Sequence, residues 1–158
     1  PSMQFEVAEN CMTCHGLAHP GLKADDLAKM LGAGHPINTD FELVKYSQGS
    51  VRHRHYLPDI KTNAEMTPQE LANIYVVSQA AALVSATEAM SKSGEAKYKE
   101  AQKKRVEIAK AALSGISEAA GLLAAPTRQN ALSFVKSVAG KDLTGAIGSK
   151  LPAKSDYK

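Results

Sequence analysis

Apolar residues recur every three or four positions over much of this chain, which is the spacing of one face of an α-helix. The clearest repeat follows a strong helix start, in which Thr67 is the N-cap, Pro68 occupies the first turn and Glu70 stands three residues after the cap. The pattern predicts a helix from residue 68 to about residue 86. Its apolar stripe consists of Leu71, Ile74, Val77, Ala81 and Val84.

The second half of the chain carries the same spacing in a segment rich in alanine and lysine. One apolar stripe extends from Val106 to Leu123, and the lysines lie mostly on other faces, so we expect this segment to be helical. Pro126 interrupts the pattern, and a shorter helix is predicted from about Thr127 to a stop at Gly140. The last 14 or so residues, with glycines, a proline and scattered lysines, predict a loose tail.

Before residue 67 the pattern is less regular, and the predicted elements are short. Residues 5–10 predict a short helix or turn. Residues 26–31 predict a short helix that ends in glycines, and residues 41–46 a helix turn or a short strand. Nothing in the pattern indicates a β-sheet, so we expect an all-α protein.

The helical pattern is broken at residues 91–94, which is the best candidate for a domain boundary. A chain of 158 residues suits one domain, or a small domain with an appendage. We therefore expect a first domain over residues 1–90 and a helical extension over residues 91–158. Aromatic residues make up only 5% of the chain and tryptophan is absent, so a large prosthetic group would supply core volume that side chains lack.

Charge is distributed unevenly along the chain. Residues 1–85 hold 6 Lys and Arg against 9 Asp and Glu, a net of −3, whereas residues 86–158 hold 13 against 7, a net of +6. The basic half predicts either a solvated surface or a docking face for an acidic partner. Its lysines are not interleaved with aromatic residues, so we expect no nucleic-acid binding. No apolar run approaches the roughly 20 residues that span a membrane.

The most specific chemistry of the chain lies in Cys11-Met12-Thr13-Cys14-His15. Two cysteines separated by two residues and followed by histidine form the attachment sequence of a c-type haem. Each thiol adds across one vinyl group of the porphyrin, and the histidine gives a nitrogen to iron. A structural zinc site would need a second ligand pair, and the chain has no other cysteine. We therefore predict one covalently attached haem c, bound by Cys11, Cys14 and His15.

The order of haem motif, irregular loop and proline-led helix resembles the class I cytochrome c fold over about residues 5–86. In that family a loop carries the distal ligand, usually methionine near a proline, and a helix with a Thr/Ser-Pro-x-Glu start follows. Tyr56-Leu57-Pro58-Asp59 and Met66-Thr67-Pro68-Gln69-Glu70-Leu71 resemble this pattern. The resemblance implies a small cytochrome c-like haem domain and a monohaem one-electron carrier, or the carrier subunit of a redox complex.

The second axial ligand of the iron differs from the family pattern, because Leu57 stands where the methionine is expected. His53 and His55 lie just before Pro58 and point to the same side of an extended chain. We expect His55 to be the ligand, with His53 next and His35 third. Two histidines would keep iron low-spin, at a lower potential than histidine with methionine.

Several further expectations accompany this interpretation. Haem is attached outside the cytoplasm, so we expect a periplasmic or otherwise extracytoplasmic protein whose export signal has been removed. We expect a redox partner protein, with an acidic one as the alternative that the charge favours, to dock on the basic helical half. The oligomeric state stays open, with a homodimer among the alternatives. No paired carboxylates, Ser/His/Asp set or phosphate loop indicates an enzyme. The alternative function is a haem-based sensor or ligand-binding protein with a displaceable distal ligand.

The remaining candidate residues have simpler interpretations. Met30 is expected in the core of its short helix, and Met66 is a weak alternative for the distal ligand, as is His19. Tyr46 and Tyr56 are expected to pack against haem. Arg52 and Arg54 either carry solvated loop charge or pair with the haem propionates.

Overall fold

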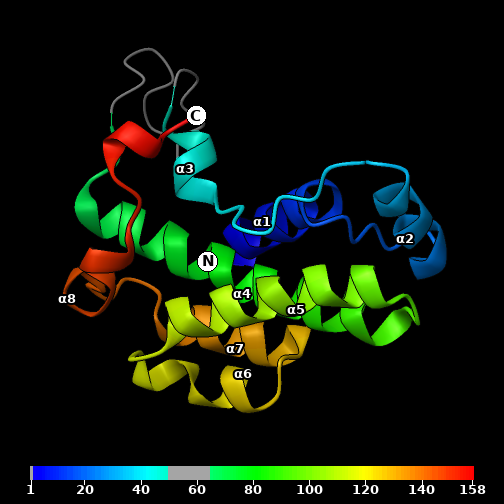
Figure 1. Cartoon of the computed structure of the whole chain (residues 1–158). Helices are drawn as coiled ribbons and strands as arrows, with labels where there is room; N and C mark the ends of the chain where they lie inside the picture. The colour runs from blue at the N-terminus through cyan, green and yellow to red at the C-terminus, as the bar shows by residue number, and fades with distance from the viewer. Residues whose placement is uncertain (1, 50–64) are drawn as a thin grey trace.

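The computed structural model describes residues 2–49 and 65–158, which form helices and turns without a β-strand (Figure 1). The prediction of an all-α protein is therefore confirmed. The helices are α1 (Ser2–His15), α2 (Ala24–Gly32), α3 (Leu43–Ser47), α4 (Pro68–Lys92), α5 (Ala96–Leu113), α6 (Ala120–Ala124), α7 (Arg128–Ser137) and α8 (Thr144–Ile147). Three 3₁₀ turns complete the set: Ser117–Ala119, Gly148–Lys150 and Lys154–Asp156.

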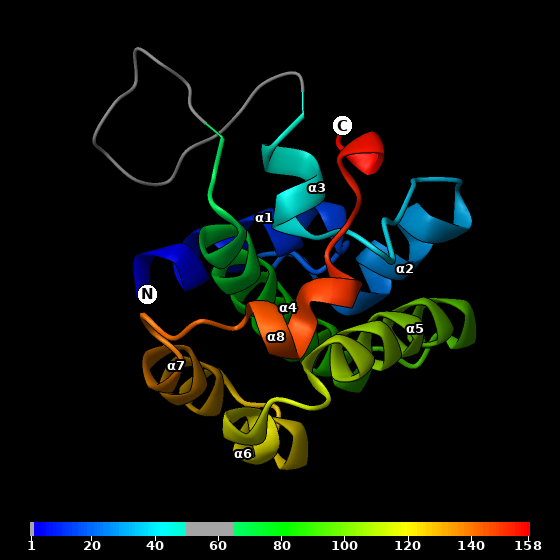
Figure 2. The same ribbon diagram turned by 90° about the vertical axis from the view of Figure 1, so that its left-hand side faces the viewer.

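Helix α4 is the centre of the molecule and contacts α1, α3, α5, α7 and α8 (Figures 1 and 2). It begins as predicted: the Thr67 side chain accepts a hydrogen bond from the Glu70 N–H, and the Glu70 carboxylate accepts one from the Thr67 N–H. The helix continues beyond residue 86 to Lys92 and is buried on nearly all sides between Ile74 and Val84. A helix buried all round needs partners on several faces, which explains why the other elements surround it.

Helix α1 is longer than the predicted short helix, because it continues through both cysteines to His15. Phe5, Ala8 and Met12 lie at helical spacing on one face and are almost completely buried. This face packs against α4. The sequence from Cys11 to His15 therefore forms the last turn of a helix rather than a loop after it.

The lysine-rich segment is interrupted where the sequence predicts one continuous stripe. Helix α5 ends at Leu113, and Gly115 adopts a φ of 90°, a conformation that glycine tolerates best. The Lys150 ammonium then donates to the carbonyl oxygens of Ala111, Ala112 and Ser114 and satisfies this helix end. Helix α7 starts at about Thr127, as the sequence predicts, and the structure shows Thr127 as its N-cap.

The sequence predicts a loose tail over the last residues; in the structure they include α8 and two 3₁₀ turns. Ile147 is buried, and Leu151 and Tyr157 pack against the core. The Lys158 N–H donates to the Lys45 carbonyl at 2.9 Å, which places the C-terminus beside α3 (Figure 2).

The apolar core extends across the predicted boundary at residues 91–94. Its main cluster contains side chains from Phe5 in α1 to Ile147 in α8. A smaller cluster joins Leu17, α2, Ala89 and Tyr98 of α5. Residues on both sides of the break between α4 and α5 thus pack against one another, while the boundary itself stays a prediction. Within the described residues, no helix is both long and apolar enough to cross a membrane.

Candidate haem-attachment site

The last turn of α1 presents Cys11 and Cys14 on one side of the helix, because residues three apart share a face. Cys11 is half-buried, Cys14 is exposed, and neither is part of a disulfide. Burial raises the pKa of the Cys11 thiol, and the neighbouring Cys14 raises it further. Cys11 is therefore a protonated thiol at neutral pH, and Cys14 is open to a bulky group arriving from solvent.

His15 follows Cys14 and stacks on an aromatic side chain. Its ring lies parallel to that of Phe41, with centroids 4.0 Å apart and planes inclined by 7°. Tyr46 completes the group at 5.6 Å from His15 and 4.7 Å from Phe41. We call these three side chains the aromatic cluster. Partial burial lowers the pKa of His15, which favours the neutral imidazole that binds metals.

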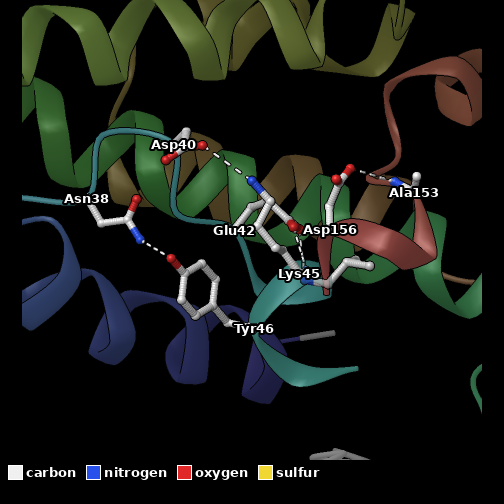
Figure 3. Close-up of polar contacts among 8 residues, drawn as sticks. Asn38, Asp40, Glu42, Lys45, Tyr46, Ala153 and Asp156 are labelled. Carbon is white, nitrogen blue, oxygen red and sulfur yellow. Dashed lines mark hydrogen bonds and ion pairs between the residues drawn. The ribbon is translucent and has the colours of Figure 1, made fainter. Parts of the chain in front are cut away.

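The segment that carries Phe41 and Tyr46 is held by polar contacts (Figure 3). The Asn38 amide donates to the Tyr46 hydroxyl, and the Asn38 N–H donates to the His15 carbonyl at 3.0 Å. The Glu42 carboxylate caps α3 by accepting from the N–H groups of the helix start. The Leu43 N–H donates to the Ser78 hydroxyl, which ties this segment to α4. The aromatic cluster is thus held in place from both α1 and α4.

The chain leaves α1 through residues 16–18, which we call the attachment turn. The Leu17 N–H bonds to the Cys14 carbonyl and the Ala18 N–H to the Thr13 carbonyl, the pattern of a Schellman motif. Leu17 has a φ of 47° at the position where glycine is usual. A side chain in this conformation costs about 1 kcal/mol, so surrounding structure must hold it.

The surrounding structure comes from α5. The Tyr98 hydroxyl donates to the Leu17 carbonyl at 2.6 Å. The Gln102 amide and the Arg105 guanidinium donate to the Gly16 carbonyl at 3.0 and 3.1 Å. Sequence reasoning missed these three residues. Their spacing of four and three places them on one face of α5, but no neighbouring residue in the sequence marks that face as buried.

The predicted distal ligands divide into two groups. His53 and His55 lie outside the described residues. His35 is exposed, and its Nδ1 lies 2.9 Å from the Pro36 carbonyl; His19 is also exposed and accepts from the Gly21 N–H through Nδ1. Met66 is buried in the main core cluster.

The prediction that Met30 belongs to the core is wrong, because 36% of its surface is exposed. Helix α2 buries Leu27, Ala28 and Leu31 instead. Met12 has a packing role besides its place in the motif, since it is buried on the face of α1 that meets α4.

The side chains of Cys11, Cys14 and His15 suit a prosthetic group that supplies most of the ligands of its own metal. Across residues 2–49 and 65–158, no three His, Cys, Asp or Glu side chains are grouped so that they could hold a metal ion. A porphyrin holds iron by its own nitrogens and needs from the protein two thiols and an axial base. Cys11, Cys14 and His15 fit that requirement.

Comparison of the chain with models of protein families, with curated proteins and with solved structures found no match. A function for this chain is therefore inferred from its own residues. The residues with the most specific chemistry are those at the end of α1.

Proposed function

We propose that this protein is a monohaem c-type cytochrome that carries single electrons, with a haem domain that resembles the class I cytochrome c fold. The observation that carries the proposal is the CxxCH sequence at the end of α1, where both thiols share a face and the histidine follows. The neighbouring rings of Phe41 and Tyr46 support it, since they cover one side of the histidine with apolar surface.

The residues of the chain have distinct roles in this proposal. The thiols of Cys11 and Cys14 would each hold the haem through a thioether: the S–H would add across one vinyl group, with sulfur on one carbon and the proton on the other, so that no oxidant would be consumed. The neutral imidazole of His15 would give a nitrogen to the iron. When bound, haem supplies reversible one-electron chemistry at iron. Phe41 packs against the His15 ring and limits both its rotation and its access to water.

Attachment is tested by mass spectrometry of the protein produced together with haem-maturation machinery. The wild-type protein should carry the mass of one haem that resists extraction by acid acetone. Cys11→Ala combined with Cys14→Ala should lose covalent haem, and a single replacement should weaken attachment. An unmodified wild-type mass under these conditions would overturn the proposal.

The axial ligands separate the electron carrier from the sensor. We expect a low-spin spectrum that carbon monoxide does not change, because in this proposal two histidines would be the protein ligands of the iron. Alanine variants at positions 55, 53 and 35 should identify the second ligand, since only its loss gives high-spin iron that binds carbon monoxide. Our order of expectation is His55, then His53, then His35. A wild-type protein that binds carbon monoxide readily would favour the sensor.

A redox partner with an acidic surface is part of this proposal. Exposed lysines lie along α5, including Lys97, Lys99 and Lys103, and would steer such a partner toward the molecule. Its association rate should therefore fall as ionic strength rises, because salt screens exposed charges. We place the protein in the periplasm, where haem c is attached.

A further inference from the structure

Helix α5 has a buried polar face that points at the attachment turn. Tyr98, Gln102 and Arg105 are 1%, 0% and 3% exposed, whereas most other polar residues of α5 are exposed. All three donate hydrogen bonds to backbone carbonyls that directly follow His15. A helix surface that served only as a docking face would have no reason to bury these groups.

Arg105 is the most costly of the three to bury. Its guanidinium donates to the Gly16 carbonyl, the Gln102 side-chain oxygen at 2.6 Å, the Met12 sulfur at 3.4 Å and the Ser85 hydroxyl at 3.4 Å. These acceptors are all neutral, and no carboxylate in residues 2–49 or 65–158 forms an ion pair with it. Burial lowers the pKa of Arg105 to about 10, so the group stays charged at neutral pH. Burying a charge without an ion-pair partner costs desolvation free energy, which the four hydrogen bonds of the guanidinium offset. A charge kept in the interior in this way is a candidate for a role beyond packing.

The attachment turn is shaped to receive this cation. Gly16 leaves no room for a side chain, because a Cβ there would overlap the Arg105 guanidinium. Leu17 adopts the left-handed conformation described above, and the Tyr98 hydroxyl holds its carbonyl. The backbone directly after His15 is therefore positioned by α5, a helix that begins beyond the predicted haem domain.

We propose that Arg105 is a positioning residue for His15 that also places a buried positive charge behind the haem-attachment turn and so raises the reduction potential of the bound haem. The inference rests on the proposed function. A nearby fixed cation disfavours the oxidised, more positive iron centre, and the buried position keeps this interaction from being screened by solvent. The helical extension is thus part of the haem site.

The experiment compares Arg105→Gln with Lys136→Gln in the haem-loaded full chain. Both variants remove one positive charge, but Lys136 is exposed on α7. Redox titration of Arg105→Gln should show the ratio of reduced to oxidised protein at a fixed potential falling on the order of fivefold. Lys136→Gln should change this ratio less than about twofold. Equal changes in both variants, or no change in either, would overturn the charge effect.

Positioning is measured separately, by hydrogen exchange of the Leu17 and Ala18 amides. These exchange rates should rise in Arg105→Gln and in Gly16→Ala, which keeps the charge and pushes the guanidinium away. Lys136→Gln should leave the rates unchanged. Arg105→Lys keeps the charge, so the reduction potential should stay close to that of the wild type, whereas the exchange rates of the Leu17 and Ala18 amides should still rise. If Arg105→Gln does not fold, the Lys and Gly16→Ala variants decide: unchanged exchange in both would overturn the positioning role.

Failure of the proposed function would be recognised independently. A wild-type chain without covalent haem would overturn the proposed function and, with it, the effect of Arg105 on the reduction potential, and the exchange comparison would still decide the positioning role. If the wild-type chain carries haem but substitution of Arg105 changes neither the reduction potential nor the amide exchange rates, the proposed cytochrome function stands and only this inference is overturned.

Discussion

The C-terminal end of α1 and the N-terminal end of α4 are both capped, but by different parts of the chain. At the start of α4, the side chains of Thr67 and Glu70 each accept a hydrogen bond from the backbone N–H of the other residue. At the end of α1, side chains 81, 86 and 89 positions away satisfy the carbonyls of Leu17 and Gly16. The first cap needs only four neighbouring residues. After α1 the N–H groups of Leu17 and Ala18 bond locally, but the carbonyls of Gly16 and Leu17 are paired only when α5 has packed beside α4.

This difference bears on the proposed haem site. A locally capped helix end keeps its geometry when distant parts of the protein loosen. The attachment turn lacks that independence, because Leu17 is held in an unfavourable conformation by contacts from α5. Substitutions on the buried face of α5 are therefore expected to alter the position of His15, whereas substitutions at the start of α4 are not.

The largest effect is expected from Arg105→Ala. It removes the guanidinium from Gly16, Gln102 and Ser85 and leaves a cavity among buried groups, so the free energy of unfolding should fall by about 3 kcal/mol. Urea denaturation measures this loss. Lys99→Ala on an exposed position of α5 should change stability by less than about 0.5 kcal/mol. Similar losses in both variants would mean that the buried face of α5 does not hold the turn.

Tyr98→Phe tests a single contact of that face. It deletes the hydroxyl that binds the Leu17 carbonyl and leaves this buried acceptor unpaired, so a loss of about 1.5 kcal/mol is expected. Exchange of the Leu17 amide should quicken as well. Tyr157→Phe is the control, since its hydroxyl forms no hydrogen bond within the part of the chain that the structure describes. A Tyr98→Phe variant as stable as the control would contradict the prediction.

Thr67→Ala tests the local cap and should cost about 1 kcal/mol. Thermal unfolding measures it, and hydrogen exchange at Leu17 should not change. Because Thr67 and Tyr98 share no contact, the double variant should show the sum of the two losses within about 0.5 kcal/mol. Strong coupling between them would show that the two helix ends are not independent.

The smallest expected effect is a pH dependence of stability that comes from Glu42, the N-cap of α3. Glu42 directly precedes α3 in the sequence, but the tertiary structure buries it. Burial raises the pKa of the Glu42 carboxyl above its ordinary 4.5, although the N–H groups of Val44 and Lys45 oppose the shift. The folded protein then holds this proton more tightly than the unfolded chain. Its contribution stabilises the fold below pH 4.5 and is lost as the pH rises through the raised value.

Glu42→Gln should remove this part of the pH dependence, because the amide stays neutral. Urea denaturation at pH values above and below 4.5 would measure it. Glu88→Gln, at an exposed ion pair with Lys92, is the matched control and should change the profile little. A wild-type profile parallel to that of Glu42→Gln would contradict the assignment.

The elements that could be predicted from sequence are those whose information is local. The start of α4, the N-cap of α7 and the break between α4 and α5 all follow from residues within one or two turns. The candidate site also rests on local information, the spacing of Cys11, Cys14 and His15, and haem attachment there stays a prediction. The resemblance to class I cytochromes and the distal histidine at position 55 or 53 stay predictions.

Tertiary structure decided the rest. Helix α1 extends to His15 because its apolar face is buried against α4, a partner 50 or more residues away. Tyr98, Gln102 and Arg105 look like solvated helix positions in sequence, since nothing nearby reveals that carbonyls of another segment will meet them. Their burial depends on how α5 packs, and so the turn behind the proposed haem ligand is determined by long-range contacts that short-range sequence patterns do not encode.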